Sequence, residues 1–206
     1  MMKATEILSS EHKVILQVLE CLQAIAAGAE KAGKIAGDSA LDAKDAIDFI
    51  QTFADRCHHG KEEDVLFKMM EDRGFPVNGG PTYVMRMEHD QGRALVRAMK
   101  ESLSLASEGN PAAVKTFVQS AQGFADLLSS HIDKEDTILY PMANQAMSDE
   151  DQKTVLTRFA DVEQNHMGAG VHEKYLGIAK KLGAQYGVEL EESEDAGCGG
   201  CGCGGH

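Results

Sequence analysis

The sequence predicts an all-α protein, an antiparallel up-down four-helix bundle with one or two extra C-terminal helices. Helix breakers are rare, since 4 of the 206 residues are Pro, while Ala, Glu, Lys, Leu and Met are plentiful. Apolar residues recur every three or four positions through several long stretches, which is the spacing of one helix face. A Glu-His pair followed by a His-x-x-x-Glu motif occurs twice, and this repetition indicates a duplicated helical hairpin.

The first half of the chain predicts two long helices. The first is expected at about 5–27, where His12 falls within the apolar series. The Ala/Gly/Lys-rich stretch 28–40 is expected to form a loop. The second helix is expected at about 41–73, and the Gly and Pro residues between 74 and 81 end it and turn the chain.

The second half of the repeat predicts two more helices. The third is expected at about 82–108, with His89 among its apolar residues. The fourth begins with Pro111, which is tolerated early in a helix because its missing N–H has no partner there. It is expected to reach about residue 147, and Pro141 is expected to kink or end it.

The last third of the chain differs in composition from the repeat. Ser148, with a capping-box carboxylate at Asp151, predicts a fifth helix at about 149–166, and a last helix is expected at about 171–186. The chain then becomes acidic and finally Cys- and Gly-rich, which predicts a flexible tail. We therefore expect three parts: a bundle at 1–147, a helical extension packed on it at 148–186, and the tail at 187–206.

Composition excludes several classes of partner. The net charge of -13 and the sequence pI near 5.0 argue against binding to nucleic acid or to anionic membranes. No stretch approaches the roughly 18 apolar residues of a membrane span, and the N-terminus has no apolar leader. The five cysteines are an odd number, and three lie in the last nine residues, so a disulfide framework is not expected. The cytoplasm is the expected compartment.

The duplicated motif places polar side chains on faces that should be buried. A His and a Glu four residues apart share one face of a helix, so each copy directs an imidazole and a carboxylate the same way. A further histidine precedes each copy by 46 or 42 residues. The aligned pairs are His12 with His89, His58 with His131, Glu62 with Glu135, Leu66 with Leu139, and Phe67 with Tyr140.

Two buried carboxylates need a compensating positive charge, because their burial without a partner costs several kcal/mol each. The nearest cations, Lys61 and Lys134, are expected to point partly outward, so a metal is the expected partner. Four imidazoles and two carboxylates without a thiolate suit iron, manganese or zinc. The two halves suggest two metals bridged by Glu62 and Glu135, and the open coordination positions favour iron over zinc.

The order His, His-x-x-x-Glu, His, His-x-x-x-Glu closely resembles the hemerythrin-like, cation-binding HHE domains over about residues 5–147. The resemblance implies an antiparallel four-helix bundle that holds two iron ions with an oxo or hydroxo bridge. It also implies that His12 and His58 bind one iron, that His89 and His131 bind the other, and that Glu62 and Glu135 bridge them.

The chain departs from the oxygen-carrying hemerythrins at two positions. Arg93 stands where those proteins have a further histidine, one turn after the third-helix ligand. Glu135 follows the fourth-helix histidine by four residues, where they have an Asp after five. The pattern lies nearer to relatives linked to iron or oxygen sensing, to peroxide or nitric oxide chemistry, and to iron–sulfur cluster repair.

Residues next to the motif are expected to lie outside the ligand set. His59 is rotated about 100° from His58 on an α-helix, so we expect it near the ligands or at the surface, and Glu63 and Asp136 are rotated similarly. Candidates for an additional metal ligand on the C-terminal helices are Glu163, His166 and His172. Candidates for hydrogen-bonding partners of the ligands are Glu11, Glu88, Tyr83, Tyr140 and Tyr175.

The tail offers a separate set of soft ligands. Cys198, Cys201, Cys203 and His206 form a Cys-x-x-Cys-x-Cys-x-x-His pattern on a Gly-rich backbone. Such a set suits zinc or another soft metal, Cu(I), or an iron–sulfur cluster.

These observations predict a non-haem di-iron protein that binds or senses O2, NO or peroxide, or that handles iron. One alternative is an enzyme that disproportionates peroxide or reduces NO. A second is an iron store or donor for iron–sulfur cluster repair, in which the Cys tail relays metal. A third is a bundle that folds without metal. The sequence names no redox partner.

Overall fold

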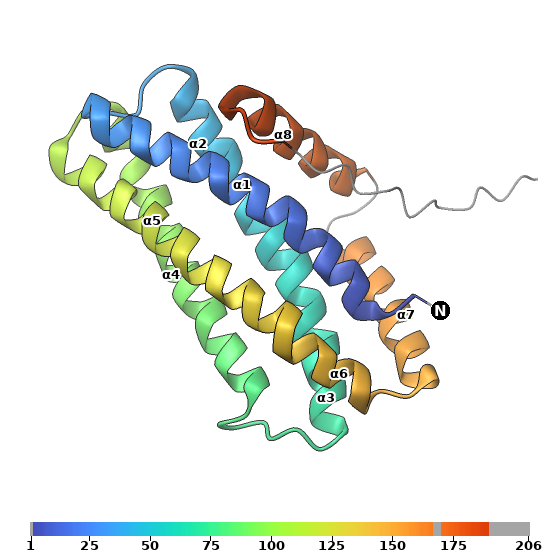
Figure 1. Ribbon diagram of the computed structural model, residues 1–206. Coiled ribbons are helices and arrows are strands. Elements are labelled where there is room, and N and C mark those ends of the chain that lie inside the picture. The colour runs from blue at the N-terminus through green and yellow to red at the C-terminus, as the bar shows by residue number, and fades with distance from the viewer. Residues whose placement is uncertain (1, 167–169, 190–206) are drawn as a thin grey trace, which may run out of the picture.

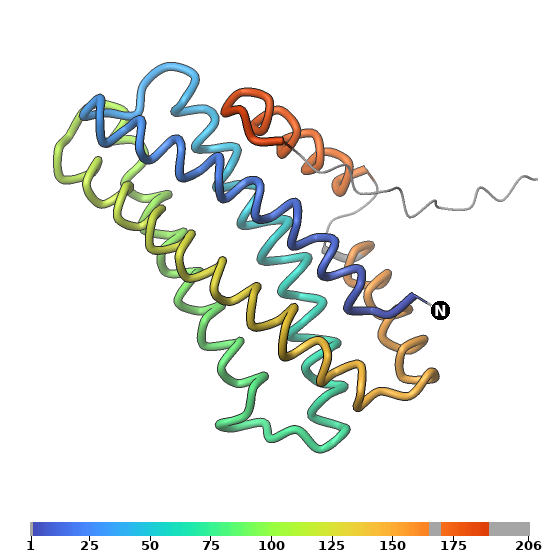
Figure 2. Tube along the Cα trace, viewed as in Figure 1, coloured from blue at the N-terminus to red at the C-terminus, as the bar shows by residue number. Residues whose placement is uncertain are grey.

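The computed structural model describes residues 2–166 and 170–189, and this part of the chain is all-helical, without a strand. Figures 1 and 2 show a helical bundle with two shorter helices beside it. The α-helices are α1 (Ala4–Ala32), α2 (Asp38–Phe49), α3 (Phe67–Asp72), α4 (Pro81–Ser107), α5 (Pro111–Lys134), α6 (Tyr140–Ala146), α7 (Asp149–His166) and α8 (Val171–Tyr186). Three π-helical segments join some of them: η1 (Ile50–His59), η2 (Glu62–Leu66) and η3 (Glu135–Leu139).

Long helical segments pack side by side along the bundle. Helix α1 lies against α2 and α5, and α4 lies against α2 and α5. The π-helical segments continue the two helices that carry the His-x-x-x-Glu motifs, so that α2 leads through η1 and η2 into α3, and α5 leads through η3 into α6. Both motif glutamates are the first residue of a π-helical segment, a local widening that often occurs at functional sites.

Local sequence explains where the helices begin and end. Helix α1 ends at Gly33, whose φ of 70° is left-handed. The Asn110 side chain accepts hydrogen bonds from the first turn of α5, and Pro111 occupies its first position. The expected capping box of α7 is confirmed, because Asp151 N–H donates to Ser148 Oγ (3.2 Å) and Ser148 N–H donates to Asp151 Oδ2 (2.9 Å).

Two expectations about helix ends are wrong. The loop expected at 28–40 is shorter, because α1 continues to Ala32 and α2 begins at Asp38. Of the two effects expected of Pro141, a kink or the end of the helix, the end is wrong, because the helix continues to Ala146. Pro141 lies in the first turn of α6, directly after η3, where a missing N–H is tolerated.

The C-terminal helices lie against the bundle. Helix α7 contacts α1, η1 and η2, and α8 contacts α1 and α2. Among residues 2–166 and 170–189, none of the helices combines the length and the apolar composition that a membrane span needs.

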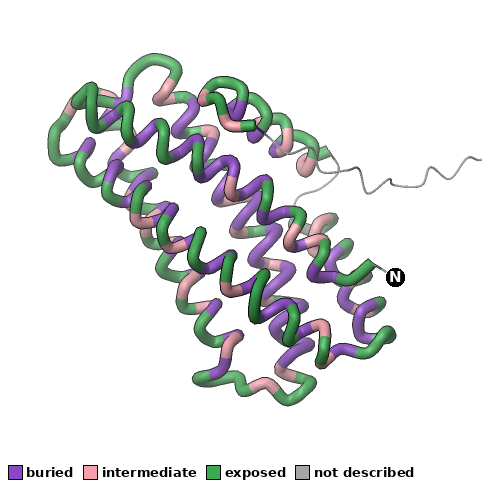
Figure 3. The backbone as a smooth tube through the Cα atoms, in the orientation of Figure 1, coloured by how far each residue is buried: buried purple, intermediate pink, exposed green. Residues whose placement is uncertain are grey.

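The buried apolar side chains form two clusters. Figure 3 shows buried positions recurring along the helices of the bundle. One cluster contains Ile15 and Phe124, and the other contains Leu8 and Phe67. His12 lies between Leu8 and Ile15 on α1, so it marks the boundary between the clusters. Ile138 and Met142 continue the apolar series of the fourth predicted helix and would on that basis face inward, but both side chains are exposed in the structure.

Candidate metal centre

The four motif histidines meet in two pairs inside the bundle. The Nε2 atoms of His12 and His58 lie 3.0 Å apart, and the Nε2 atoms of His89 and His131 also lie 3.0 Å apart. Each of these side chains is at most 2% exposed. The pairs come from α1 with η1 and from α4 with α5, so each half of the repeat contributes one pair.

The two motif glutamates lie between the histidine pairs. Glu135 Oε2 is 3.3 Å from His12 Nε2, and Glu135 Oε1 is 3.2 Å from His131 Nε2. Glu62 Oε2 is 3.7 Å from His58 Nε2 and 3.5 Å from His89 Nε2. Each carboxylate therefore reaches one histidine of either pair, as a bridging group would.

A second layer of carboxylates holds the imidazoles. Every Nδ1 atom of the two pairs faces one carboxylate: Asp136 for His12 (3.1 Å), Glu11 for His58 (2.9 Å), Glu63 for His89 (2.7 Å) and Glu88 for His131 (2.8 Å). A carboxylate only accepts, so each Nδ1 carries a proton, and the Nε2 atom is the one that presents its lone pair to a metal once it has lost its own proton. The second layer thus orients four metal-type donor atoms toward one space.

The inner carboxylates lack the partners that burial requires. Within the described residues, Glu62 Oε2 and both oxygens of Glu135 accept no hydrogen bond, although both residues are fully buried. Lys61 pairs with Glu11, Lys134 with Glu88, and Arg93 with Glu63, so these cations serve the second layer. The described Lys and Arg side chains near the centre therefore leave Glu62 and Glu135 without a permanently charged partner, and a metal cation would supply one.

The spacing of the donor atoms fits a metal ion. Two donors that each lie about 2.1 Å from one ion at a right angle are about 3.0 Å apart. Both Nε2–Nε2 distances are 3.0 Å. The residues present therefore fit a cation in each half of the centre.

The pKa values show how the same atoms hold protons in place of a metal. Burial alone would lower the pKa of His12, but the hydrogen bond to Asp136 and the negative charges of Asp136 and Glu135 outweigh it and raise that pKa to about 9. Burial and the nearby Glu135 carboxylate raise the pKa of Glu62 well above its usual range. Burial lowers the pKa of His58 and His89 well below the usual value, and neighbouring imidazoles add to this. The electron-rich centre thus attracts protons at some positions and leaves bare lone pairs at others.

Tyr140 is a buried hydroxyl at the centre, as the sequence suggested. Its Oη donates to Glu62 Oε1 at 2.6 Å and lies 3.3 Å from His12 Nε2. Burial and the Glu62 charge raise the pKa of this phenol well above its usual value, so it stays protonated and acts as a donor. Tyr83 is exposed, and Tyr175 bonds to Asp48 away from the centre.

His59 was expected either near the ligands or at the surface, and the structure places it near the ligands. It is not at the surface but buried, and its ring stacks on that of His89 with centroids 3.8 Å apart and planes 13° apart. One of its ring nitrogens lies within 4.8 Å of donor atoms of Glu62, His89 and His131. Two stacked parallel rings cannot both hold one ion in their planes, so His59 forms a wall of the centre in this conformation.

Glu63 and Asp136, expected near the ligands or at the surface, both contact ligand imidazoles, whereas the burial of Lys61 was not expected from the sequence. Glu63 and Asp136 bond to imidazoles because they lie in the π-helical segments, whose wider turns rotate successive side chains less than an α-helix does. Lys61, expected to point partly outward, is fully buried because α7 covers it and Glu163 pairs with it. The sequence showed only that Lys61 and Lys134 occupy equivalent positions in the two copies of the motif, and this alignment does not indicate burial.

The other candidate ligands lie apart from the two histidine pairs or outside the described part of the chain. Glu163 pairs with Lys61, and the ring of His172 stacks on Phe53 with centroids 5.4 Å apart. The side chain of His166 and the tail residues Cys198, Cys201, Cys203 and His206 lie outside the described residues.

Comparison with known proteins identifies a domain that covers most of the chain. The family description "Hemerythrin HHE cation binding domain" matches residues 3–143. The chain is 26% identical over 188 residues to "Uncharacterized protein Rv1995" of Mycobacterium tuberculosis and to "Uncharacterized protein Mb2018" of Mycobacterium bovis, covering 87% of this chain and 70% of each relative. No solved structure matches the chain significantly.

Proposed function

Because the chain belongs to the hemerythrin HHE cation-binding family, we propose that its buried centre holds two iron ions and binds or senses a small molecule such as O2, NO or peroxide. One iron is assigned to His12 and His58 and the other to His89 and His131, with Glu62 and Glu135 as bridges. The described helices are assigned to the antiparallel up-and-down bundle of this family.

A single observation carries the proposal. Three of the four oxygens of two fully buried carboxylates have no hydrogen-bond partner in the described residues, and four imidazole Nε2 atoms surround them. A polar network that served only the fold would satisfy these oxygens with donors, because a buried unpaired carboxylate oxygen is strongly unfavourable. Thiolates are absent from both histidine clusters, and imidazole with carboxylate suits iron.

The residues of the chain divide the work at this centre. Bound iron would supply redox chemistry and an open coordination position for the small molecule. Glu11, Glu63, Glu88 and Asp136 fix the four imidazole rings through their Nδ1 atoms. Tyr140 Oη provides one protonated donor within the centre, held by Glu62. The apolar clusters on both sides exclude water and strengthen these contacts.

Binding is favoured over turnover because, apart from the proposed ligands and the carboxylates that hold them, the described centre offers few groups that could act as a general acid or base. Within the described residues, Tyr140 is the hydroxyl donor at the centre, and burial and carboxylate charge raise its pKa, which makes proton release difficult. A catalyst of peroxide disproportionation or NO reduction needs groups that cycle their protons near neutral pH.

Titration of the reduced, iron-loaded full-length protein with O2, NO or peroxide tests the proposal. We expect a saturable spectral change with one of these molecules, at a fixed stoichiometry per chain. Continuous consumption of peroxide or NO over many equivalents would replace the proposal with the enzymatic alternative. An unchanged spectrum with all three would refute it.

A further inference from the structure

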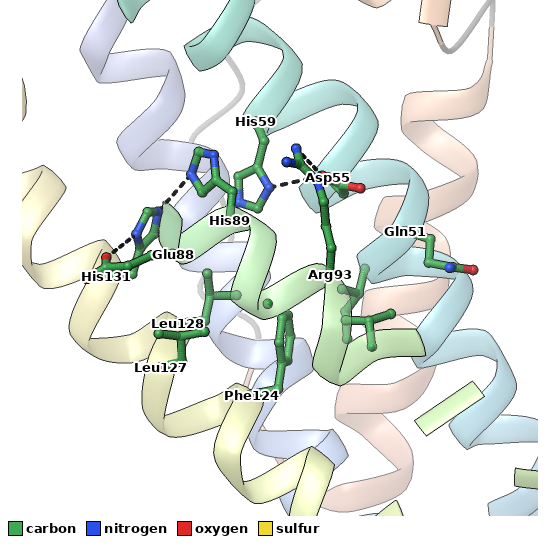
Figure 4. Close-up of a pocket in the computed structure, with 13 residues that line it drawn as sticks. Gln51, Asp55, His59, Glu88, His89, Arg93, Phe124, Leu127, Leu128 and His131 are labelled. Atoms are coloured by element: carbon green, nitrogen blue, oxygen red, sulfur yellow. Dashed lines mark hydrogen bonds and ion pairs between the residues drawn. The ribbon is translucent and has the colours of Figure 1, made fainter. Parts of the chain in front are cut away.

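A small cavity lies beside the His89–His131 pair, and Figure 4 shows the side chains that line it. Its volume is about 70 Å³. The imidazoles of His59, His89 and His131 line its inner end, and Figure 4 shows the rings of His59 and His89 lying face to face there. Its walls are mostly apolar, formed by Ile50, Val96, Phe124, Leu127 and Leu128.

The duplicated sequence explains why the cavity is described in this half of the protein. Gly92 lines the cavity three residues after His89, and the equivalent residue three positions after His12 is Ile15. Ile15 is buried within an apolar cluster, so this position carries a packed side chain in the other half. A Cβ atom at Gly92 would lie 3.3 Å from Phe124 Cε2, so even one added carbon would enter this space.

The side chains around the cavity become less exposed from the surface toward the imidazoles. Arg93 is 35% exposed and binds Asp55 through Nε at 2.8 Å. It also binds Glu63 at 2.7 Å and Asp90 at 2.9 Å, so its charge is compensated by three carboxylates. His89 at the inner end is 2% exposed. This half therefore has a path from a surface ion-pair cluster to the centre.

The equivalent positions in the opposite half carry different residues. Where His59 lines the cavity, the equivalent position in the second motif is the buried Ile132. Where Arg93 turns outward, the equivalent position on α1 is Leu16, which packs against the apolar core. The sequence repeat is thus broken at the positions that decide whether a small molecule fits beside the histidine pair.

The size and lining of the cavity select the class of ligand. An engineered protein cavity of about 150 Å³ binds benzene, so this cavity of about 70 Å³ has room for a molecule of about two or three heavy atoms. The apolar walls disfavour charged molecules, and Arg93 is already paired and offers no uncompensated charge to an anion. A neutral, weakly polar diatomic molecule fits both conditions.

We propose that this cavity is the docking and access site for a neutral diatomic molecule, which reaches the centre from the His89–His131 side. Occupancy of the cavity rests on the cavity alone, whereas the reaction of the molecule at the imidazoles rests on the proposed di-iron function. The proposal makes the two halves of the duplicated centre inequivalent, with the His89–His131 half as the accessible one.

Xenon is the probe for the first part, because it is a compact apolar atom that binds dry protein cavities. Crystals of the full-length protein, with whatever metal it retains, are pressurised with xenon. The variants are Gly92→Ala, which narrows the cavity, and Gly123→Ala as a matched control. A Cβ at Gly123, also within a helix, would meet Leu95 at an ordinary 3.7 Å.

We expect xenon density between Gly92, Phe124 and Leu128 in the wild type and in Gly123→Ala, and loss of most of it in Gly92→Ala. Absence of xenon from this cavity in the wild type, or equal occupancy in Gly92→Ala, would overturn the docking site.

The second part is tested by stopped-flow measurement of NO binding to the iron-loaded protein. The association rate should fall several-fold in Gly92→Ala relative to Gly123→Ala at equal iron content, and equal rates would overturn the access path. A chain that binds xenon here but does not load iron would refute the proposed function and leave the cavity assignment standing.

Discussion

Replacing Lys61 with Met should destabilise the protein far more than the same change at Lys134, its counterpart in the repeat. Both lysines neutralise a carboxylate that holds a histidine ring, Glu11 in one half and Glu88 in the other. Their environments differ, since the Lys61 side chain is fully buried and that of Lys134 is 35% exposed. A comparison of the two lysine variants therefore measures the effect of burial at equivalent positions of the repeat.

The expected magnitudes follow from the fate of the remaining carboxylate. Loss of Lys61 leaves Glu11, whose side chain is 8% exposed, as a buried charge without its cation, and breaking such a pair costs about 3–5 kcal/mol. Glu163 adds little to this, because it is 45% exposed and returns to water. Loss of the partly exposed Lys134 should cost about 1 kcal/mol or less.

Guanidinium unfolding of the full-length variants, with metal load held equal by a chelator, gives the two free-energy differences. A second change, Glu11→Gln in the Lys61→Met background, should restore part of the loss because it removes the stranded charge. Equal effects of the two lysine substitutions, or no recovery in the double variant, would refute the reasoning about burial.

Three further predictions concern the metal. His131→Ala should lose most of one metal ion per chain, as measured by elemental analysis, and retention of two ions with an unchanged spectrum would contradict the ligand assignment. Glu88→Gln should weaken metal affinity by about 10–100-fold in a chelator competition, because the carboxylate fixes the His131 ring; unchanged affinity would mean that the ring needs no such partner. Metal affinity should rise with pH up to about 9, because His12 with its pKa of about 9 and Glu62 with its raised pKa hold protons that the metal must displace. Chelator titrations at several pH values measure this, and an affinity that does not vary with pH would argue against proton displacement.

The fold class and the inner residues of the centre could be predicted because they follow a strict α-helical period. His12 continues the apolar series of α1, and the His-x-x-x-Glu spacing places His131 and Glu135 on one face. The roles of Glu11 and Glu88 were also predictable. Each directly precedes the histidine that lies upstream of a His-x-x-x-Glu motif, and each could reach an imidazole on a neighbouring helix.

The positions of the residues next to the motif depend on π-helical segments, which could not be predicted from the sequence pattern. The rotation of 100° per residue left two positions open for His59, Glu63 and Asp136, near the ligands or at the surface. In the structure all three lie in the π-helical segments η1, η2 and η3 and contact the imidazoles.

The burial of Lys61 and the cavity beside His89 depend on tertiary packing. Helix α7 covers Lys61 from outside the repeat, so the aligned motifs could not distinguish it from Lys134. The aligned halves show that Gly92 takes the position equivalent to Ile15. That this Gly borders a cavity could be recognised only from the position of Phe124 in the structure. These features arise where the two halves of the duplication have diverged.

Metal content and the visible spectrum of full-length protein, purified without oxygen and then exposed to air, test the central claim most directly. The account predicts two irons per chain and absorption bands of a bridged ferric pair that grow on exposure. Zinc alone, or a metal-free protein that folds with the same stability, would contradict it.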